Sequence, residues 1–270
     1  MNSKQDNEIQ NKVSQHLEKC LSNLDREWFV ICACGSMNYG LWDELSDVDT
    51  KLIVFPTFEE IIFHKQPISK TKIFSNGEHC DIKDIREYFK VLQKQNINFM
   101  EILFTNYWIV NDKYIDIWMD LRRHAEEIAR GNPYQAMRCY KGMAHEKAHS
   151  FFTRIAGDAP SAEFCYDSKT LSHILRLYDF AYKYSNQINY SKCLIPDKAD
   201  WLMDIKRRRV NFSYEEAANM VKDTIEKIDK LECLFNKYHE NIMNEEVKEI
   251  LEFNLKQAMI RNLKTTIQGA

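Results

Sequence analysis

Two short apolar runs near the start of the chain restrict what it can fold into. The first, "WFVICAC", covers residues 28–34 and ends at Gly35, and the second, "VDTKLIVF", covers residues 48–55 and ends at Pro56. Runs of this length that are bounded by Gly or Pro are typical of buried strands rather than helices. We therefore predict two buried strands separated by a short polar segment.

The sequence around these runs mixes helical and extended patterns. Apolar residues over about 5–25 follow the spacing of an amphipathic helix. The segment "KTKIFSNGEHCDIKDI" over 70–85 contains Asn76-Gly77, a dipeptide that indicates a tight turn between two strands. A helix is predicted to follow over 84–95. The N-terminal part should therefore combine a sheet with helices.

From about residue 114 onward the apolar pattern is almost wholly helical. One long helix is predicted to start at Ser213, which forms a capping-box pattern with Glu216. The chain of 270 residues has 7 glycines and 5 prolines, and this scarcity also favours a helix-rich protein. We predict an α/β (α+β) fold with an N-terminal domain over 1–125 and a helical C-terminal domain over 126–270.

Charge and targeting signals limit the partners and the compartment. The formal net charge is −3, so no overall electrostatic attraction to nucleic acid is expected. The N-terminal stretch lacks the apolar core of a signal peptide, and no run is apolar for long enough to cross a bilayer. The 8 cysteines form no C-x-x-C pair and are expected to be reduced. We expect a cytoplasmic protein with no membrane partner.

Two aspartates one residue apart stand where the second apolar run begins. On a strand, Asp47 and Asp49 would point to one face while Val48 enters the core. Two carboxylates so close repel each other unless a cation lies between them. Mg²⁺ suits such a pair, because it takes one or two carboxylates together with substrate phosphates. Lys51 follows on the same face, where it would pair with Asp49 or reach a phosphate.

Residues on both sides of the acid pair, as we call Asp47 and Asp49, complete a candidate site. Gly35 ends the first predicted strand and would let the backbone approach a ligand closely, and Ser36 would offer its hydroxyl and amide to a phosphate. A third carboxylate, Asp81, lies on another predicted strand. Two metal ions bridged by three carboxylates would activate an attacking hydroxyl and stabilise a leaving pyrophosphate.

At these residues the sequence resembles a known family. "GSMNYG" followed by "SDVDTKLIV" resembles the G-S-x-x-Y-G…S-D-x-D signature of the DNA polymerase β-type nucleotidyltransferase superfamily. Within it, the similarity is to the predicted bacterial and phage nucleotidyltransferases. "NINFMEILF" resembles a further family segment through Asn96 and Glu101, although Ile97 stands where a proline often follows the asparagine. The resemblance extends over roughly residues 30–180.

The resemblance implies a mixed-sheet nucleotidyltransferase domain followed by a helical C-terminal domain. It implies transfer of a nucleoside monophosphate from an NTP to an acceptor hydroxyl, with Mg²⁺ or Mn²⁺ as the metal. By position, Asp47, Asp49 and Asp81 would be the catalytic, metal-binding carboxylates, and Asp81 would help to activate the acceptor. Gly35 and Ser36 would hold the triphosphate. The acceptor stays open between an RNA or tRNA end, a protein side chain and a small molecule.

Three basic residues in the helical half form a second candidate. "KTLSHILRL" resembles a helical segment of the same group and contains Lys169, His173 and Arg176. Their spacing of i, i+4 and i+7 places them on one face of a helix. We predict that this face binds the triphosphate or a nucleic-acid backbone, and the alternative is an ordinary solvated face.

Other patterns support different functions. A chain that keeps this fold without turnover would be a nucleotide-binding or toxin–antitoxin-type regulatory protein. "HEKAH" matches the zinc hydrolase pattern H-E-x-x-H, with His145 and His149 as ligands, although no known downstream extension follows it. Arg138 and His145 also fit the loose pattern of HEPN ribonucleases. The basic run over Arg207–Arg209 is either a contact for a polyanionic acceptor or a solvated face.

Overall fold

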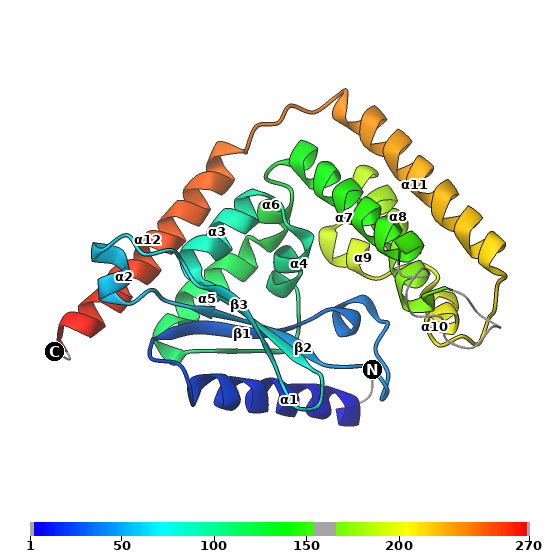
Figure 1. Ribbon diagram of the computed structural model, residues 1–270. Helices are drawn as coiled ribbons and strands as arrows, with labels where there is room; N and C mark the ends of the chain where they lie inside the picture. Colours follow the sequence, from blue (N-terminus) through cyan, green and yellow to red (C-terminus); the bar gives the residue numbers. More distant parts are fainter. Residues whose placement is uncertain (1–2, 154–165, 269–270) are drawn as a thin grey trace. The chain divides into compact units, whose positions relative to one another are not determined.

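The chain folds into two compact units. The computed structural model describes residues 3–153 and 166–268. The sheet unit consists of Met1–Asn38, Trp42–Gly131 and Met243–Ala270, and the helical unit consists of Tyr39–Leu41 and Asn132–Ile242. Figure 1 shows the strands and the helices of both units.

The sheet unit is built on one five-stranded mixed sheet. Its strands lie in the order β3-β4-β2-β1-β5, in which β2 and β4 are parallel and every other neighbouring pair is antiparallel. This arrangement confirms the predicted α/β (α+β) fold class with a mixed sheet. The strands are β1 (Trp28–Cys34), β2 (Asp49–Val54), β3 (Ser69–Ile73), β4 (His79–Asp84) and β5 (Trp108–Val110).

Helices cover both faces of this sheet (Figure 1). Helix α1 lies on one face and contacts β1, β2 and β5, while α3 lies on the other and contacts β2 and β4. Short turns of 3-10 helix, η1 (Ser36–Tyr39), η2 (Glu101–Leu103) and η3 (Asp112–Tyr114), connect the elements. The helices of the sheet unit are α1 (Ser3–Leu21), α2 (Phe58–Ile62), α3 (Ile85–Gln93), α4 (Ile97–Met100), α5 (Ile115–Arg123), α6 (Ala125–Ala129) and α12 (Glu245–Gln268).

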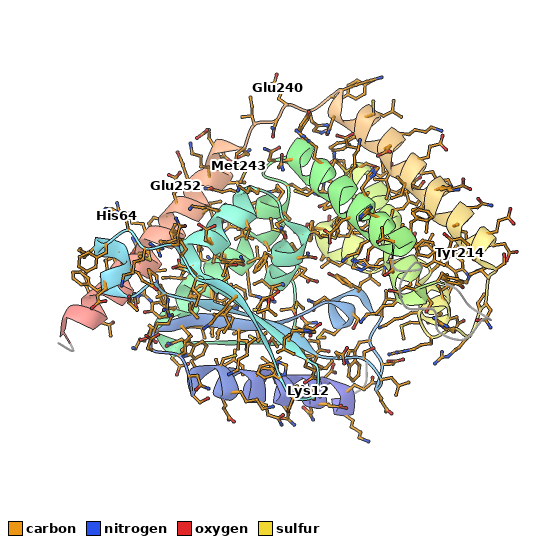
Figure 2. All side chains as sticks on the ribbon, in the orientation of Figure 1. Lys12, His64, Tyr214, Glu240, Met243 and Glu252 are labelled. Atoms are coloured by element: carbon orange, nitrogen blue, oxygen red, sulfur yellow. The ribbon has the colours of Figure 1, made fainter. Side chains whose placement is uncertain are left out.

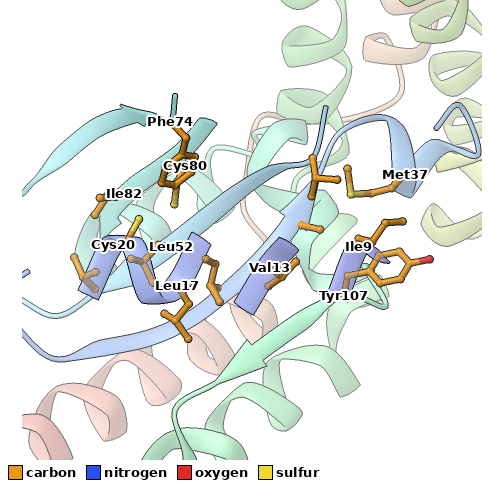
Figure 3. Packing of buried hydrophobic residues seen from close by; sticks show 14 of the residues in the cluster. Ile9, Val13, Leu17, Cys20, Met37, Leu52, Phe74, Cys80, Ile82 and Tyr107 are labelled. Carbon is orange, nitrogen blue, oxygen red and sulfur yellow. The ribbon is translucent and has the colours of Figure 1, made fainter. Parts of the chain in front are cut away.

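The core beneath α1 follows from the spacing of apolar residues in both elements. Ile9, Val13 and Leu17 repeat every four residues along α1 and pack on the face of the sheet that carries Leu52 and Ile82 (Figure 3). Complete burial of one such side chain stabilises the fold by about 1.5–3 kcal/mol. Alternate residues of β2 therefore enter this core, and the residues between them face the opposite side of the sheet.

The helical unit contains the remaining long helices. Ser213 caps α11 through the amide of Glu216, and the Glu216 side chain returns to the Ser213 amide, which confirms the predicted capping box. No helix among the described residues combines the length and apolarity needed to cross a bilayer. The helices of this unit are α7 (Pro133–Thr153), α8 (Ser168–Ser185), α9 (Tyr190–Leu194), α10 (Ala199–Lys206) and α11 (Tyr214–Asn236).

The units differ in three places from the predicted division into 1–125 and 126–270. The sheet unit extends past the predicted boundary, to Gly131. Helix α12 belongs to the sheet unit, where it contacts α3 and α5; Figure 2 labels Met243 and Glu252 on this C-terminal segment. Asn254 donates to Asp120 Oδ2 over 3.0 Å and holds α12 against α5. The tripeptide 39–41, conversely, belongs to the helical unit. Helical periodicity predicts that α12 is a helix, but it does not indicate which core the helix joins.

Candidate functional site

The turn after β1 and the acid pair around the start of β2 meet at one end of two paired strands. In the antiparallel register, Cys34 is opposite Asp49, so Gly35 and Ser36 follow β1 next to the point where β2 begins. Gly35 has a φ of 88°, and a Cβ atom added to it would meet nothing within 4 Å. The glycine is therefore required by the backbone conformation of the turn rather than by crowding.

This turn is anchored on the inside and open at Ser36. Met37 is buried in the core beneath α1 (Figure 3), and Asn38 Nδ2 donates to the Ala33 carbonyl over 3.2 Å. The Gly35 amide donates to Glu101, whose carboxylate oxygens lie at 3.3 and 3.4 Å and whose exposed fraction is 2%. Within the described part of the chain, the Ser36 hydroxyl forms no hydrogen bond. Ser36 is thus better placed than the Gly35 amide to bind a phosphate.

The acid pair alternates about a buried residue as predicted. Val48 is 0% exposed, whereas Asp47 is exposed and Asp49 is half-exposed. Strand β2 begins at Asp49, so Asp47 belongs to the preceding loop. That loop is closed by Ser46, whose hydroxyl donates to Asp43 Oδ1 over 2.8 Å. The serine of the S-D-x-D pattern therefore shapes the loop that carries Asp47.

Asp49 is held by the strand beside it. His79, the first residue of β4, donates its backbone amide to Asp49 Oδ1 over 2.9 Å, and His79 Nδ1 lies 3.1 Å from the same oxygen. Both side chains remain about half-exposed. The second oxygen of Asp49 takes part in none of these contacts.

Asp81 shares the face of Asp49 and Lys51, but it lies further along the sheet. In the parallel pairing of β2 and β4, Asp81 is opposite Lys51, two residues beyond Asp49. Its two oxygens accept hydrogen bonds from Lys51 Nζ at 2.9 Å and Thr71 Oγ1 at 2.6 Å. Lys51 thus pairs with Asp81, and the predicted pairing with Asp49 is not formed.

The contacts between Lys51 and Asp81 keep both side chains charged. Burial favours the neutral form of Asp81, but the charge of Lys51 and the hydrogen bond from Thr71 outweigh it and lower the pKa of the carboxyl. Burial also works against the charge of Lys51, which is 5% exposed, yet the nearby carboxylates of Asp81 and Glu101 raise the pKa of this ammonium. Asp81 is therefore an anion with both oxygens occupied, which makes it a weak base.

The carboxylates differ in how well they suit a divalent cation. Across residues 3–153 and 166–268, no group of three or more His, Cys, Asp or Glu side chains is arranged to hold a metal ion. Asp47 and Asp49 match Mg²⁺ by donor type, since Mg²⁺ needs one or two carboxylates in addition to substrate phosphates. Asp81 would first have to release Lys51. The metal site of three carboxylates stays a prediction.

The three basic residues of α8 do not share one exposed face. Lys169 is exposed, but Arg176 is 2% exposed and donates from Nη2 to His173 Nε2 over 2.9 Å. Cζ of Arg176 lies 3.7 Å from the centroid of the Tyr39 ring, within the helical unit. Burial and the charge of Arg176 lower the pKa of His173, so the imidazole is neutral. The signature tyrosine thus stacks on a buried arginine, and Lys169 alone retains the predicted exposure.

Helix α7 carries the H-E-x-x-H pattern, but its first histidine is already paired. His145 Nε2 lies 2.8 Å from Asp229 Oδ1, and Lys141 approaches the same oxygen at 3.4 Å. An open pocket of about 430 Å³ lies beside His145 and His149, with Phe152 in its wall. Among the described residues, His145 and His149 belong to no group of three or more His, Cys, Asp or Glu side chains that could hold a zinc ion.

Most of the basic run near α10 serves local structure. Arg208 donates from Nη2 to the Tyr166 carbonyl over 3.1 Å, and Arg209 pairs with Asp204 at 3.4 Å. Lys206, just before the run, donates to the Leu41 carbonyl over 2.7 Å. These contacts favour the structural interpretation over a contact with a polyanion.

Comparison of the chain with protein-family models and with curated proteins finds no match. The resemblance to a nucleotidyltransferase family therefore stays a prediction, which rests on the signature residues of the sequence.

Proposed function

We propose that the protein is a metal-dependent nucleotidyltransferase that moves a nucleoside monophosphate from an NTP to an acceptor hydroxyl. One observation carries the proposal: Asp49, the first residue of β2, is opposite Cys34 in the sheet, so Asp49 begins β2 beside the Gly35–Ser36 turn that follows β1, and Asp47 lies two residues before it. A phosphate held at Ser36 would lie next to two carboxylates suited to its counter-ion. This juxtaposition joins residues that are eleven or more positions apart in the sequence.

Each residue of the site would have a separate role in such a reaction. Asp47 and Asp49 would hold Mg²⁺ or Mn²⁺, which would neutralise phosphate charge during transfer. Ser36 would bind a non-transferred phosphate through its hydroxyl. The acceptor oxygen forms a bond to the α-phosphorus while the bond to the bridging oxygen breaks; the proton of the acceptor hydroxyl passes to water, and pyrophosphate leaves. Asp81, held by Lys51, would accept a hydrogen bond from the acceptor hydroxyl and orient it.

A second candidate is a nucleotide-binding protein without turnover. The contact between Lys51 and Asp81 favours it, because an anion with both oxygens occupied is poorly placed to take the acceptor's proton. The two candidates make the same prediction for NTP binding and opposite predictions for pyrophosphate release.

Incubation with NTPs labelled at the α-phosphate tests the proposal. All four NTPs are offered with Mg²⁺ or Mn²⁺ to RNA, protein and small-molecule fractions. We expect label transfer and pyrophosphate release that fall by more than about 100-fold in Asp47→Asn or Asp49→Asn, since loss of a metal ligand removes several kcal/mol of stabilisation. Asp25→Asn, an 86% exposed aspartate of the same unit, is the matched control and should retain activity.

The results separate the candidates. Binding of NTP that depends on Asp49, without release of pyrophosphate across the acceptor fractions, would favour the binding protein. Transfer that persists in Asp47→Asn and Asp49→Asn would show that the site lies elsewhere.

A further inference from the structure

A buried carboxylate lies immediately behind the acid pair. Glu78 precedes β4 and is 3% exposed, although glutamate is rarely buried so completely. Nothing in the local sequence pattern predicts this burial, because Glu78 directly follows the turn at Asn76-Gly77, where charged residues are usually solvated. Such a group needs nearly complete hydrogen bonding, since an unpaired buried charge is strongly destabilising.

Four donors surround the Glu78 carboxylate. Lys12 and Asn76 donate from their side chains, and His16 Nε2 lies 3.1 Å from Oε2. The fourth donor is the backbone amide of Val48, at 3.2 Å from Oε1. Two carboxylate oxygens offer about four acceptor positions, so these donors fill the capacity of the group. Lys12, labelled in Figure 2, and His16 both come from α1.

The orientation of His16 completes the network. Burial lowers the pKa of His16, so its ring is neutral and carries one proton. With that proton on Nε2 toward Glu78, Nδ1 accepts from the Thr50 hydroxyl at 3.0 Å. The network therefore joins α1 to β2 on both sides of Asp49, through Val48 and Thr50.

Glu78 and its neighbour His79 form two hydrogen bonds that restrain the acid pair. Glu78 binds the amide of Val48, the residue between Asp47 and Asp49, and its neighbour His79 binds the Asp49 side chain. All of these residues belong to the sheet unit. Because Asp47 precedes the strand, the ladder of β2 does not fix it, and the bond to Val48 is the nearest restraint on its backbone.

We propose that Glu78 is a positioning residue that fixes the backbone between Asp47 and Asp49, so that the two carboxylates meet one divalent cation. The inference rests on the proposed function, which supplies the reason for a cation at this place. Residues that orient metal ligands typically contribute about 10-fold to 100-fold to metal affinity. A merely structural Glu78 would affect the stability of the fold and leave the metal affinity of the folded protein unchanged.

Mn²⁺ binding by the full chain tests this role without requiring turnover. Free Mn²⁺ is measured by its electron paramagnetic resonance signal during titration of wild type, Asp49→Asn, Glu78→Gln and Lys12→Met. We expect binding that Asp49→Asn abolishes and that Glu78→Gln weakens by about 10-fold or more. Lys12→Met removes one donor from a partly exposed position, so it should fold more readily and show a smaller loss in the same direction.

Glu60→Gln is the matched control. Glu60 also pairs with a basic residue, Arg26, and accepts a backbone amide, that of Thr57 at 3.0 Å, within the sheet unit. It should lose stability and keep its Mn²⁺ affinity. If Mn²⁺ binding depends on Asp49 but is unchanged in Glu78→Gln and Lys12→Met, the role of Glu78 is refuted while the proposed function stands. If wild type shows no Mn²⁺ binding that depends on Asp49, the proposed function fails, and the inference fails with it.

Discussion

The charge of Glu78 should make the stability of the sheet unit depend on pH in the acid range. Burial raises the pKa of this carboxyl, but the hydrogen bonds from Lys12, Asn76, Val48 and His16 outweigh burial and lower it to about 2 from an ordinary value of 4.5. A difference of that size corresponds to about 3 kcal/mol of stabilisation when the group is ionised.

The sign follows from the direction of the shift. Because the folded chain holds Glu78 ionised at a lower pH than the unfolded chain does, the contribution is complete above about pH 4.5 and is lost as the pH falls towards 2. Gln resembles the protonated acid in shape and hydrogen bonding. Glu78→Gln should therefore lower the free energy of unfolding by about 3 kcal/mol at pH 7, and the difference from wild type should shrink in acid.

Urea unfolding of both proteins at a series of pH values from 7 to 3 measures this difference. Comparison of the two proteins at each pH cancels the titration of groups that they share. Two curves of unfolding free energy that stay parallel down to pH 3 would refute the reasoning, because they would show that Glu78 has the same pKa in the folded and unfolded chains.

Two further substitutions follow from the conformation of the turn and from the stacked arginine. Gly35→Ala should destabilise the protein by about 1–2 kcal/mol in thermal unfolding, because Gly35 has a positive φ. Gly142→Ala, in the interior of α7 with open space around it, should stabilise the protein by about 1 kcal/mol. Equal effects of the two substitutions would contradict the backbone argument. The effects of Tyr39→Leu and Arg176→Met on the free energy of unfolding should be coupled by about 2 kcal/mol in a double-mutant cycle, since the cation–π contact is desolvated. Additive effects would mean that the stacking contributes nothing to stability.

The parts of the fold that depend on local sequence could be predicted. Strands β1 and β2 are short apolar runs with clear stops, and the turn between β3 and β4 has Gly77 at a φ of 87°, a left-handed conformation that favours glycine. The alternation about Val48 follows from the two-residue period of extended chain. These features need no knowledge of distant residues.

The parts that were missed depend on partners far away in the chain. The burial of Glu78 requires Lys12 and His16 from α1, which lie 66 and 62 residues away. Lys51 was correctly placed on the face of the acids, but the parallel register of β2 and β4, which no local pattern specifies, gives it Asp81 as its partner. Pairing in sheets and packing of helices are set by the whole fold, so single-sequence patterns do not predict them.

The division of the chain into units has a consequence for any attempt to dissect the protein. The backbone passes between the units four times, after residues 38, 41, 131 and 242, so neither unit is one continuous stretch of the gene. A truncation after residue 242 would keep the whole helical unit but remove α12 from α3 and α5. Excision of the helical half as a single block would leave Tyr39 behind without Arg176. Separate production of the units therefore requires internal deletions that are bridged by new linkers rather than a single cut.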